Sequence, residues 1–136
     1  MPFSPDDAQA WLAADFAPWV QALNLTVTAV TVNSAQLTMP ITPALARVGG
    51  IVCGQSLAAM ADTTMVIACA GHFGEPRPVG TVTLDTQFLR PGAGSHIRCD
   101  AEIIRAGKSL IFARATLVAL PDDKPVAMAT ATFFAG

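Results

Sequence analysis

The chain has 136 residues, of which 52% are hydrophobic and only 13% are charged, and its formal net charge is −2. This length suits one domain with its own core, and the charge gives no electrostatic basis for binding nucleic acid. Three cysteines without a C-x-x-C pair argue against a disulfide framework or a zinc site. We therefore expect a single domain over residues 1–136 with no metal.

The scarcity of charge indicates surface reserved for subunit contacts, since oligomer interfaces are depleted of charged residues. The alternative is an apolar but monomeric protein. The N-terminal sequence MPFSPDDAQAW is acidic and lacks the pattern of a signal peptide. No apolar run is long enough to span a membrane. We expect a cytoplasmic protein with no membrane partner.

Residues 1–23 are expected to form an N-terminal helical segment. Ser4 is the predicted N-cap, because a proline and two acidic residues follow it. Pro18 interrupts the helical spacing of apolar residues and predicts a break or two short helices. Trp11 and Trp19 are interpreted as core or interface residues, or alternatively as a lid over a ligand tunnel.

Residues 25–32 alternate apolar side chains with threonine, which predicts a half-buried strand. A second strand over residues 36–41 completes a hairpin through the turn at Asn33-Ser34. Residues 42–48 are expected to be a connecting loop.

The most apolar stretch, GGIVCGQSLAAMADTTMVIACAG, covers residues 49–71. It predicts a long buried helix that begins at Gly54 or Gln55, runs to about Ala70 and stops at Gly71.

The single charge of that helix is Asp62. An ionised carboxylate within an apolar helix is costly unless a partner or a cavity compensates it. Asp62 is therefore the leading candidate for function. The alternative is a structural acid bonded to Thr63 or Thr64, or one that faces solvent at an interface.

A loop over residues 72–78 and four strands follow, which we expect to form an antiparallel meander. The predicted strands cover residues 79–89, 96–104, 109–120 and 126–134. A curved sheet wrapped around the central helix satisfies this order and predicts an α+β fold. Because one sheet cannot cover a helix on all sides, pairing of two such units would bury the remainder.

Three local signatures carry a family resemblance. Asp62 follows Cys53 by nine positions, residues 88–91 read FLRP, and residues 105–108 read RAGK. Together with the layout, they resemble the hotdog-fold thioesterases, specifically the phenylacetate-degradation type of acyl-CoA thioesterase. The resemblance covers residues from about 25 onward and implies a hotdog fold. Cys53 replaces the usual histidine, and Gln55 replaces a glycine.

The resemblance implies hydrolysis of an acyl-CoA thioester to free acid and coenzyme A, with Asp62 as nucleophile or general base. A helix N-terminus offers free N–H groups to a developing oxyanion, so Gly54, with or without Gln55, is the expected donor. Gln55 alternatively only caps the helix. Thr81 matches a residue that helps to hold the attacking water in relatives, and is alternatively a solvent-facing strand residue.

Coenzyme A carries phosphates, for which cationic side chains are the expected partners. The resemblance places Arg90, Arg105 and Lys108 where the family meets the arm of coenzyme A, and Arg47 lies beside the glycine loop. Arg90, Arg105 and Lys108 are each alternatively a plain surface charge, and Arg47 either pairs with an acid or contacts the ligand. No cofactor is expected, because coenzyme A is part of the substrate.

Gly54 and Asp62 are eight residues apart, which is about 12 Å along one helix. Reacting atoms must come within about 3–3.5 Å, so the two residues serve one carbonyl only if they come from different chains. We therefore expect a homodimer or homotetramer with composite active sites. A non-catalytic acyl-CoA binding or sensing protein is the first alternative, and a hotdog hydratase or dehydratase is a weaker one.

The remaining polar and sulfur-containing residues receive structural interpretations. His72 and His96 have no partner at metal-ligand spacing and are predicted to be loop residues. Cys53 is interpreted as a small packing residue, although a helix N-terminus lowers a thiol pKa and suits a nucleophile. Met60 and Met65 are expected to line the core or an acyl pocket.

Overall fold

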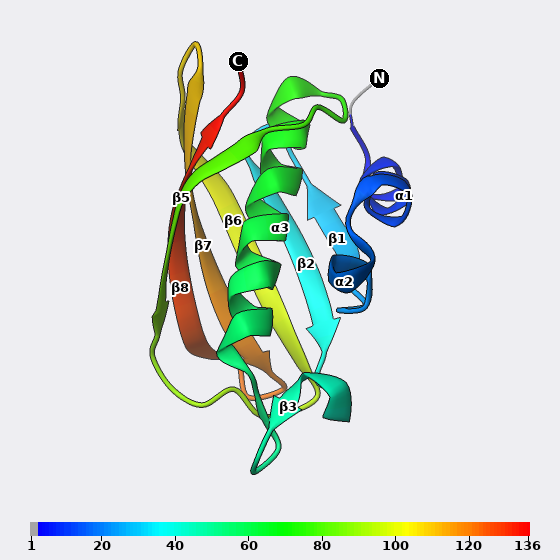
Figure 1. The fold of residues 1–136 in the computed structure, drawn as a ribbon, viewed down its shortest axis with the longest axis vertical. Coiled ribbons are helices and arrows are strands. Elements are labelled where there is room, and N and C mark those ends of the chain that lie inside the picture. Colours follow the sequence, from blue (N-terminus) through cyan, green and yellow to red (C-terminus); the bar gives the residue numbers. More distant parts are fainter. Residues whose placement is uncertain (1–2) are drawn as a thin grey trace.

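The structure is a computed structural model that describes residues 3–136, so the first two residues of the expected N-terminal segment lie outside it. In chain order the elements are α1 (Pro5–Asp15), α2 (Pro18–Gln21), β1 (Thr26–Val30), β2 (Ser34–Pro40), η1 (Pro43–Leu45), β3 (Ala46–Arg47), β4 (Ile51–Val52), α3 (Gly54–Phe73), β5 (Gly80–Phe88), β6 (His96–Ala106), β7 (Leu110–Leu120) and β8 (Lys124–Phe134). The long helix α3 lies against one face of a curved sheet, as Figure 1 shows.

Six strands form one antiparallel sheet in the order β1-β2-β6-β7-β8-β5. The expected α+β arrangement, a curved sheet wrapped around the central helix, is confirmed. The predicted four-stranded meander is wrong, because β5 pairs with β8 and not with β6. The free edge of β6 is occupied by β2, for example in the pair Leu37↔Cys99, so only β8 is left for β5.

The N-terminal segment folds as predicted. The Ser4 hydroxyl accepts a hydrogen bond from the Asp7 N–H at 3.1 Å, and the Asp7 carboxylate accepts one from the Ser4 N–H at 3.0 Å. This capping box starts α1. The break at Pro18 is confirmed, since α1 ends at Asp15 and α2 begins at Pro18 itself.

Helix α3 is longer than predicted, and Gly71 is not its stop. The helix continues to Phe73, and Gly74 supplies the left-handed C-cap with φ of 77°. Gly71 is instead needed for close packing: a Cβ atom there would lie 2.4 Å from the backbone oxygen of Thr31. The predicted loop histidines are also corrected, because His72 lies in the last turn of α3 and His96 begins β6.

The segment before α3 is more structured than the expected loop over residues 42–48. It forms the 3-10 turn η1 and strand β3, which pairs with β4. Gly49 and Gly50 make the intervening turn with φ of 93° and 74°, a conformation that residues with a Cβ atom rarely adopt. This small hairpin holds the chain immediately before the start of α3.

The core lies between α3 and the concave face of the sheet. Side chains of β2, β6, β7 and β8 alternate between buried and exposed positions, as expected for strands with one covered face. Met60 and Met65 are fully buried, so they belong to the core. None of the helices described in residues 3–136 is long and apolar enough to cross a membrane.

The two edge strands of the sheet, β1 and β5, differ in how far their edges are covered by other parts of the chain. At β1, the side-chain amide of Gln9 donates to the Leu25 carbonyl at 3.0 Å and accepts from the Val27 N–H at 2.8 Å. Helix α1 thus supplies the hydrogen bonds that a neighbouring strand would make. At the other edge, β5 is exposed along most of its length, and 57% of Val82 and 55% of Phe88 are accessible.

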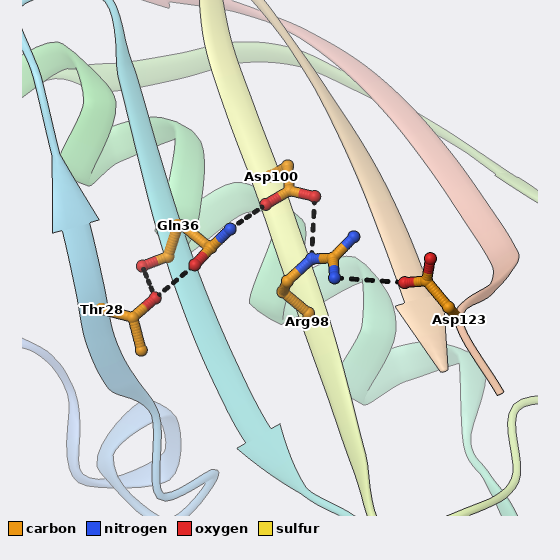
Figure 2. A network of polar contacts seen from close by, with 5 residues as sticks. All are labelled: Thr28, Gln36, Arg98, Asp100 and Asp123. Atoms are coloured by element: carbon orange, nitrogen blue, oxygen red, sulfur yellow. Dashed lines mark hydrogen bonds and ion pairs between the residues drawn. The ribbon is translucent and has the colours of Figure 1, made fainter. Parts of the chain in front are cut away.

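The convex face of the sheet carries a polar network across three strands and a turn (Figure 2). The Asp100 carboxylate accepts from the Gln36 amide at 2.8 Å and from the Arg98 guanidinium at 3.0 Å. Arg98 also donates to Asp123 at 3.2 Å, and the Thr28 hydroxyl donates to Gln36 at 2.9 Å. These hydrogen-bonded side chains join β1, β2 and β6 to the β7–β8 turn.

Replacement of Gly71 by alanine tests the packing of α3 on β1. The new methyl group would collide with the Thr31 backbone oxygen, which cannot move aside as a flexible side chain does. We expect Gly71→Ala to lower the free energy of unfolding by about 1–3 kcal/mol, measured by urea denaturation, although alanine favours helix over glycine. Gly80→Ala is the matched control, because its Cβ atom meets no heavy atom within 4 Å. Unchanged or increased stability of Gly71→Ala would contradict this account.

Candidate active site

Asp62 lies on the side of α3 that the sheet leaves uncovered. The residues that share this incompletely buried stripe at helical spacing are Gln55, Ala58, Ala59, Asp62 and Val66. The carboxylate is half-buried, and its Oδ1 atom accepts a hydrogen bond from the Thr81 hydroxyl of β5 at 3.1 Å. The structure therefore brings these two expected site residues together. Thr81 is an exposed residue of β5, as its alternative interpretation expects, but its hydroxyl is directed to Asp62.

The surroundings of Asp62 make its carboxylate a stronger base than a solvated one. Burial among apolar side chains raises the pKa of Asp62, and the hydrogen bond from Thr81 lowers it by a smaller amount, so the net shift is upward. An ionised carboxylate with a raised pKa takes a proton from water more readily than one with an ordinary pKa. Thr64, one of the two hydroxyls considered as partners of a structural Asp62, donates to the Met60 carbonyl instead.

The N-terminus of α3 forms the second part of the site. Gly54 is its first residue, and no acceptor within residues 3–136 is hydrogen-bonded to the Gly54 N–H. The Phe88 ring lies over this position, so that a Cβ atom on residue 54 would be 3.2 Å from Phe88 Cζ. A glycine thus leaves the amide accessible beside an aromatic side chain, although the ring limits the space for a larger residue.

A cavity of about 320 Å³ opens beside Gly54. Its walls come from the β3–β4 hairpin, the first turn of α3 and the segment after β5, namely Arg47, Ile51, Val52, Gly54, Leu57, Phe88, Leu89, Arg90, Pro91 and Gly92. The Val52 N–H donates to the Gly92 carbonyl at 2.9 Å, which fixes the two walls against each other. Phe88 and Leu89 belong to this cavity, although the FLRP signature pointed only to the arginine.

The four predicted cations separate into two pairs. Arg47 and Arg90 both line the cavity beside Gly54. Arg105 and Lys108 lie at and beside the β6–β7 turn, at the end of the sheet where β5 begins, whereas Arg90 follows the end of β5 (Figure 1). A single chain therefore does not bring all four cations to one groove.

Gln55 and Cys53 flank Gly54. Gln55 is exposed, and its side chain makes no hydrogen bond within the described part of the chain, so a capping role is not supported. Cys53 is the N-cap residue, and its Sγ atom lies 3.2 Å from the Ser56 hydroxyl. Burial raises the pKa of the Cys53 thiol, but the hydrogen bond with Ser56 and the N–H groups of the first turn outweigh this effect and lower it. Among residues 3–136, no group of acids, histidines and cysteines is arranged to hold a metal ion.

The two parts of the site are separated along one helix. Asp62 follows Gly54 by eight positions in α3, which corresponds to about 12 Å along the helix axis. The Asp62–Thr81 pair and the Gly54 amide with its cavity are therefore two half-sites of one chain. They cannot contact the same carbonyl group.

Comparison with known proteins gives one family match and many similar folds. A family model described as the acyl-CoA thioesterase N-terminal domain matches residues 37–134. No match was found among curated proteins.

Among solved structures, a thioesterase family protein from Silicibacter pomeroyi is 25% identical with a TM-score of 0.83, over 93% of each chain. A thioesterase from Haemophilus influenzae is 17% identical with a TM-score of 0.86, over 98% of this chain and 91% of that one. The PaaI protein of the phenylacetic acid degradation operon of Escherichia coli is 21% identical with a TM-score of 0.82, over 96% of this chain and 91% of that one. These similarities confirm the expected hotdog fold.

Substitutions at the Asp62–Thr81 pair should change stability in opposite directions. Because folding raises the pKa of Asp62, the folded state loses stability as the pH rises from the unfolded pKa near 3.8 through the folded value. Asp62→Asn removes this charge and keeps an acceptor for Thr81. We expect it to be more stable than the wild type at pH 7, with a smaller difference near pH 4, in urea denaturation.

Thr81→Val is the matched counterpart. It removes the hydroxyl that stabilises the ionised carboxylate while preserving side-chain size, so we expect lower stability than wild type at pH 7. Equal effects of both variants at both pH values would show that the charge of Asp62 does not influence folding.

Proposed function

Because the chain belongs to the acyl-CoA thioesterase family, we propose that it hydrolyses acyl-CoA thioesters with Asp62 as nucleophile or general base and the Gly54 N–H as oxyanion donor. The observation that carries this proposal is the half-buried Asp62 carboxylate, held by Thr81 on the uncovered side of α3, with a raised pKa. A thioester needs an attacking group and a donor for the developing oxyanion, and the two half-sites offer one each.

We propose that the working unit is a homodimer, alone or within a homotetramer. The uncovered stripe of α3 and the open edge of β5 lie next to each other, joined by the bond between Asp62 and Thr81. A long exposed edge strand with apolar residues invites pairing with another strand. In a two-fold pair with antiparallel α3 helices, the Gly54 end of one chain approaches Asp62 of the other.

The reaction follows from this placement. In the general-base route, Asp62 takes a proton from a water molecule whose oxygen forms a bond to the thioester carbonyl carbon. The carbonyl oxygen becomes an anion and accepts from the Gly54 N–H, aided by the positive end of the α3 dipole. The carbon–sulfur bond then breaks, and the leaving thiolate receives the proton that Asp62 took. In the nucleophilic route, an Asp62 oxygen forms a bond to the carbonyl carbon, and the carbon–sulfur bond breaks to release the coenzyme A thiolate and leave a mixed anhydride. Water then hydrolyses the anhydride to the free acid and the Asp62 carboxylate, and a proton from this water neutralises the thiolate.

The cations support a coenzyme A substrate. Arg47 and Arg90 line the Gly54 cavity, where guanidinium groups can bind phosphate oxygens. In the antiparallel pair, the Gly54 end of one chain meets the end of the other chain that carries Arg105 and Lys108. All four positions then border one groove, which is the arrangement that a phosphate-bearing arm requires.

Hydrolysis of a panel of acyl-CoA substrates, followed by release of free thiol, tests the proposed chemistry. We expect wild-type turnover and a loss of at least about 100-fold in kcat for Asp62→Asn, because the amide cannot take up a proton or attack the carbonyl. Asp122→Asn is the control, since this acid is exposed in the β7–β8 turn. Hydrolysis that survives Asp62→Asn would refute the assigned role, and tight binding without wild-type turnover would favour an acyl-CoA sensor.

Mixing of two inactive variants tests the composite site. Asp62→Ala removes the acid, and Gly54→Pro removes the backbone N–H. Proline is tolerated at the first position of a helix, and the preceding residue, Cys53, has the extended conformation that proline requires. With random exchange, half of the dimers are mixed and one of their two sites is intact, so we expect about a quarter of wild-type activity.

Gly54→Ala is the matched control for the proline variant, because it adds the same Cβ contact to Phe88 but keeps the N–H. It should retain more activity than Gly54→Pro. Absence of recovery in a mixture whose subunits have demonstrably exchanged would rule out complementation between chains.

A further inference from the structure

A second cavity, of about 380 Å³, lies on the same side of α3 as Asp62 but away from the Gly54 end. Its volume is within the range of small-molecule pockets. Apolar side chains from three parts of the chain form its lining, namely Trp11, Phe16, Ala17, Val66, Pro78 and Val79.

Two walls of this cavity continue directly from the Asp62–Thr81 pair. Val66 is four residues after Asp62, so it lies on the same helix face about 6 Å further along. Val79 is two residues before Thr81 in the extended segment that leads into β5, so both side chains point to the same face. A group bound at the Asp62 carboxylate therefore has the cavity as its neighbour.

The third wall comes from the N-terminal helices and is held in place. The rings of Trp11 and Phe16 pack edge to face with centroids 5.1 Å apart. The Phe16 carbonyl accepts from the Gln21 amide at 2.7 Å, and Gln9 ties α1 to β1. This wall is therefore held in position at one side of the cavity.

We propose that this cavity receives the acyl group of the substrate and that Trp11, Phe16 and Val66 determine which acyl groups are accepted. The inference rests on the proposed thioester hydrolysis at Asp62. The apolar lining selects uncharged acyl groups, and the volume of about 380 Å³ suits compact ones, of about the size of one ring or a short chain. Asp15 also borders the cavity, and its carboxylate disfavours acyl groups that end in a carboxylate.

The substrate profile of cavity variants tests this inference. The panel contains acetyl-, hexanoyl-, phenylacetyl-, palmitoyl- and succinyl-CoA, and kcat/KM is measured for each. Wild type should prefer the hexanoyl and phenylacetyl substrates. Val66→Phe fills the cavity, so we expect the preference for these substrates over acetyl-CoA to fall by about 10-fold or more. Trp11→Ala removes a large part of one wall, so we expect a higher relative rate with palmitoyl-CoA.

Val32→Phe is the matched control, because it adds the same ring at an exposed position of the β1–β2 turn. It should keep the wild-type profile. An unchanged ratio of rates in both Val66→Phe and Trp11→Ala, with normal wild-type turnover that depends on Asp62, would overturn the acyl cavity alone. Absence of wild-type turnover with every substrate would overturn the proposed function and this inference with it. Two variants are used so that misfolding of one does not decide the outcome.

Discussion

Helix α3 is apolar on nearly every side, and one curved sheet can bury only the side that faces it. This constraint shapes the rest of the molecule. The N-terminal helices cover part of the remaining surface, and the stripe that stays open contains the one acidic residue of the helix. Partial burial also raises the pKa of Asp62, whereas full exposure would leave an ordinary carboxylate.

Much of the fold was predictable, because a helix or strand that buries one face repeats its apolar residues at a regular spacing in the sequence. Period-two patterns located the strands to within a few residues, and the 3.6-residue pattern located α3. Two features depended on contacts between distant segments and were not predictable. Gly71 resembles a helix stop in sequence, and only the nearby Thr31 backbone shows that it is a packing glycine. The pairing of β5 with β8 depends on β2 having occupied the edge of β6.

Those parts of the candidate site that depend on sequence spacing within one helix or strand were predictable. The family resemblance identified Asp62, Gly54 and Thr81 as site residues. The rise per residue of an α-helix was enough to predict that Gly54 and Asp62 lie too far apart to contact one carbonyl group. The grouping of cations was not predictable, because it depends on which end of the sheet each turn reaches. The place of Phe88 over Gly54 was also missed, since the period-two pattern of an edge strand does not say which partner a half-exposed ring will contact.

The side chain of Gln9 has a consequence for the size of the assembly. A sheet with two free edges can add copies without limit and grow into a fibre, whereas a sheet with one free edge can join only to a second free edge. Helix α1 satisfies two hydrogen-bonding groups at the start of β1, so in the proposed dimer a sheet joined through β5 would have its β1 edges partly covered against further addition. In such a dimer, the single side chain of Gln9 would help to keep the joined sheet at two chains.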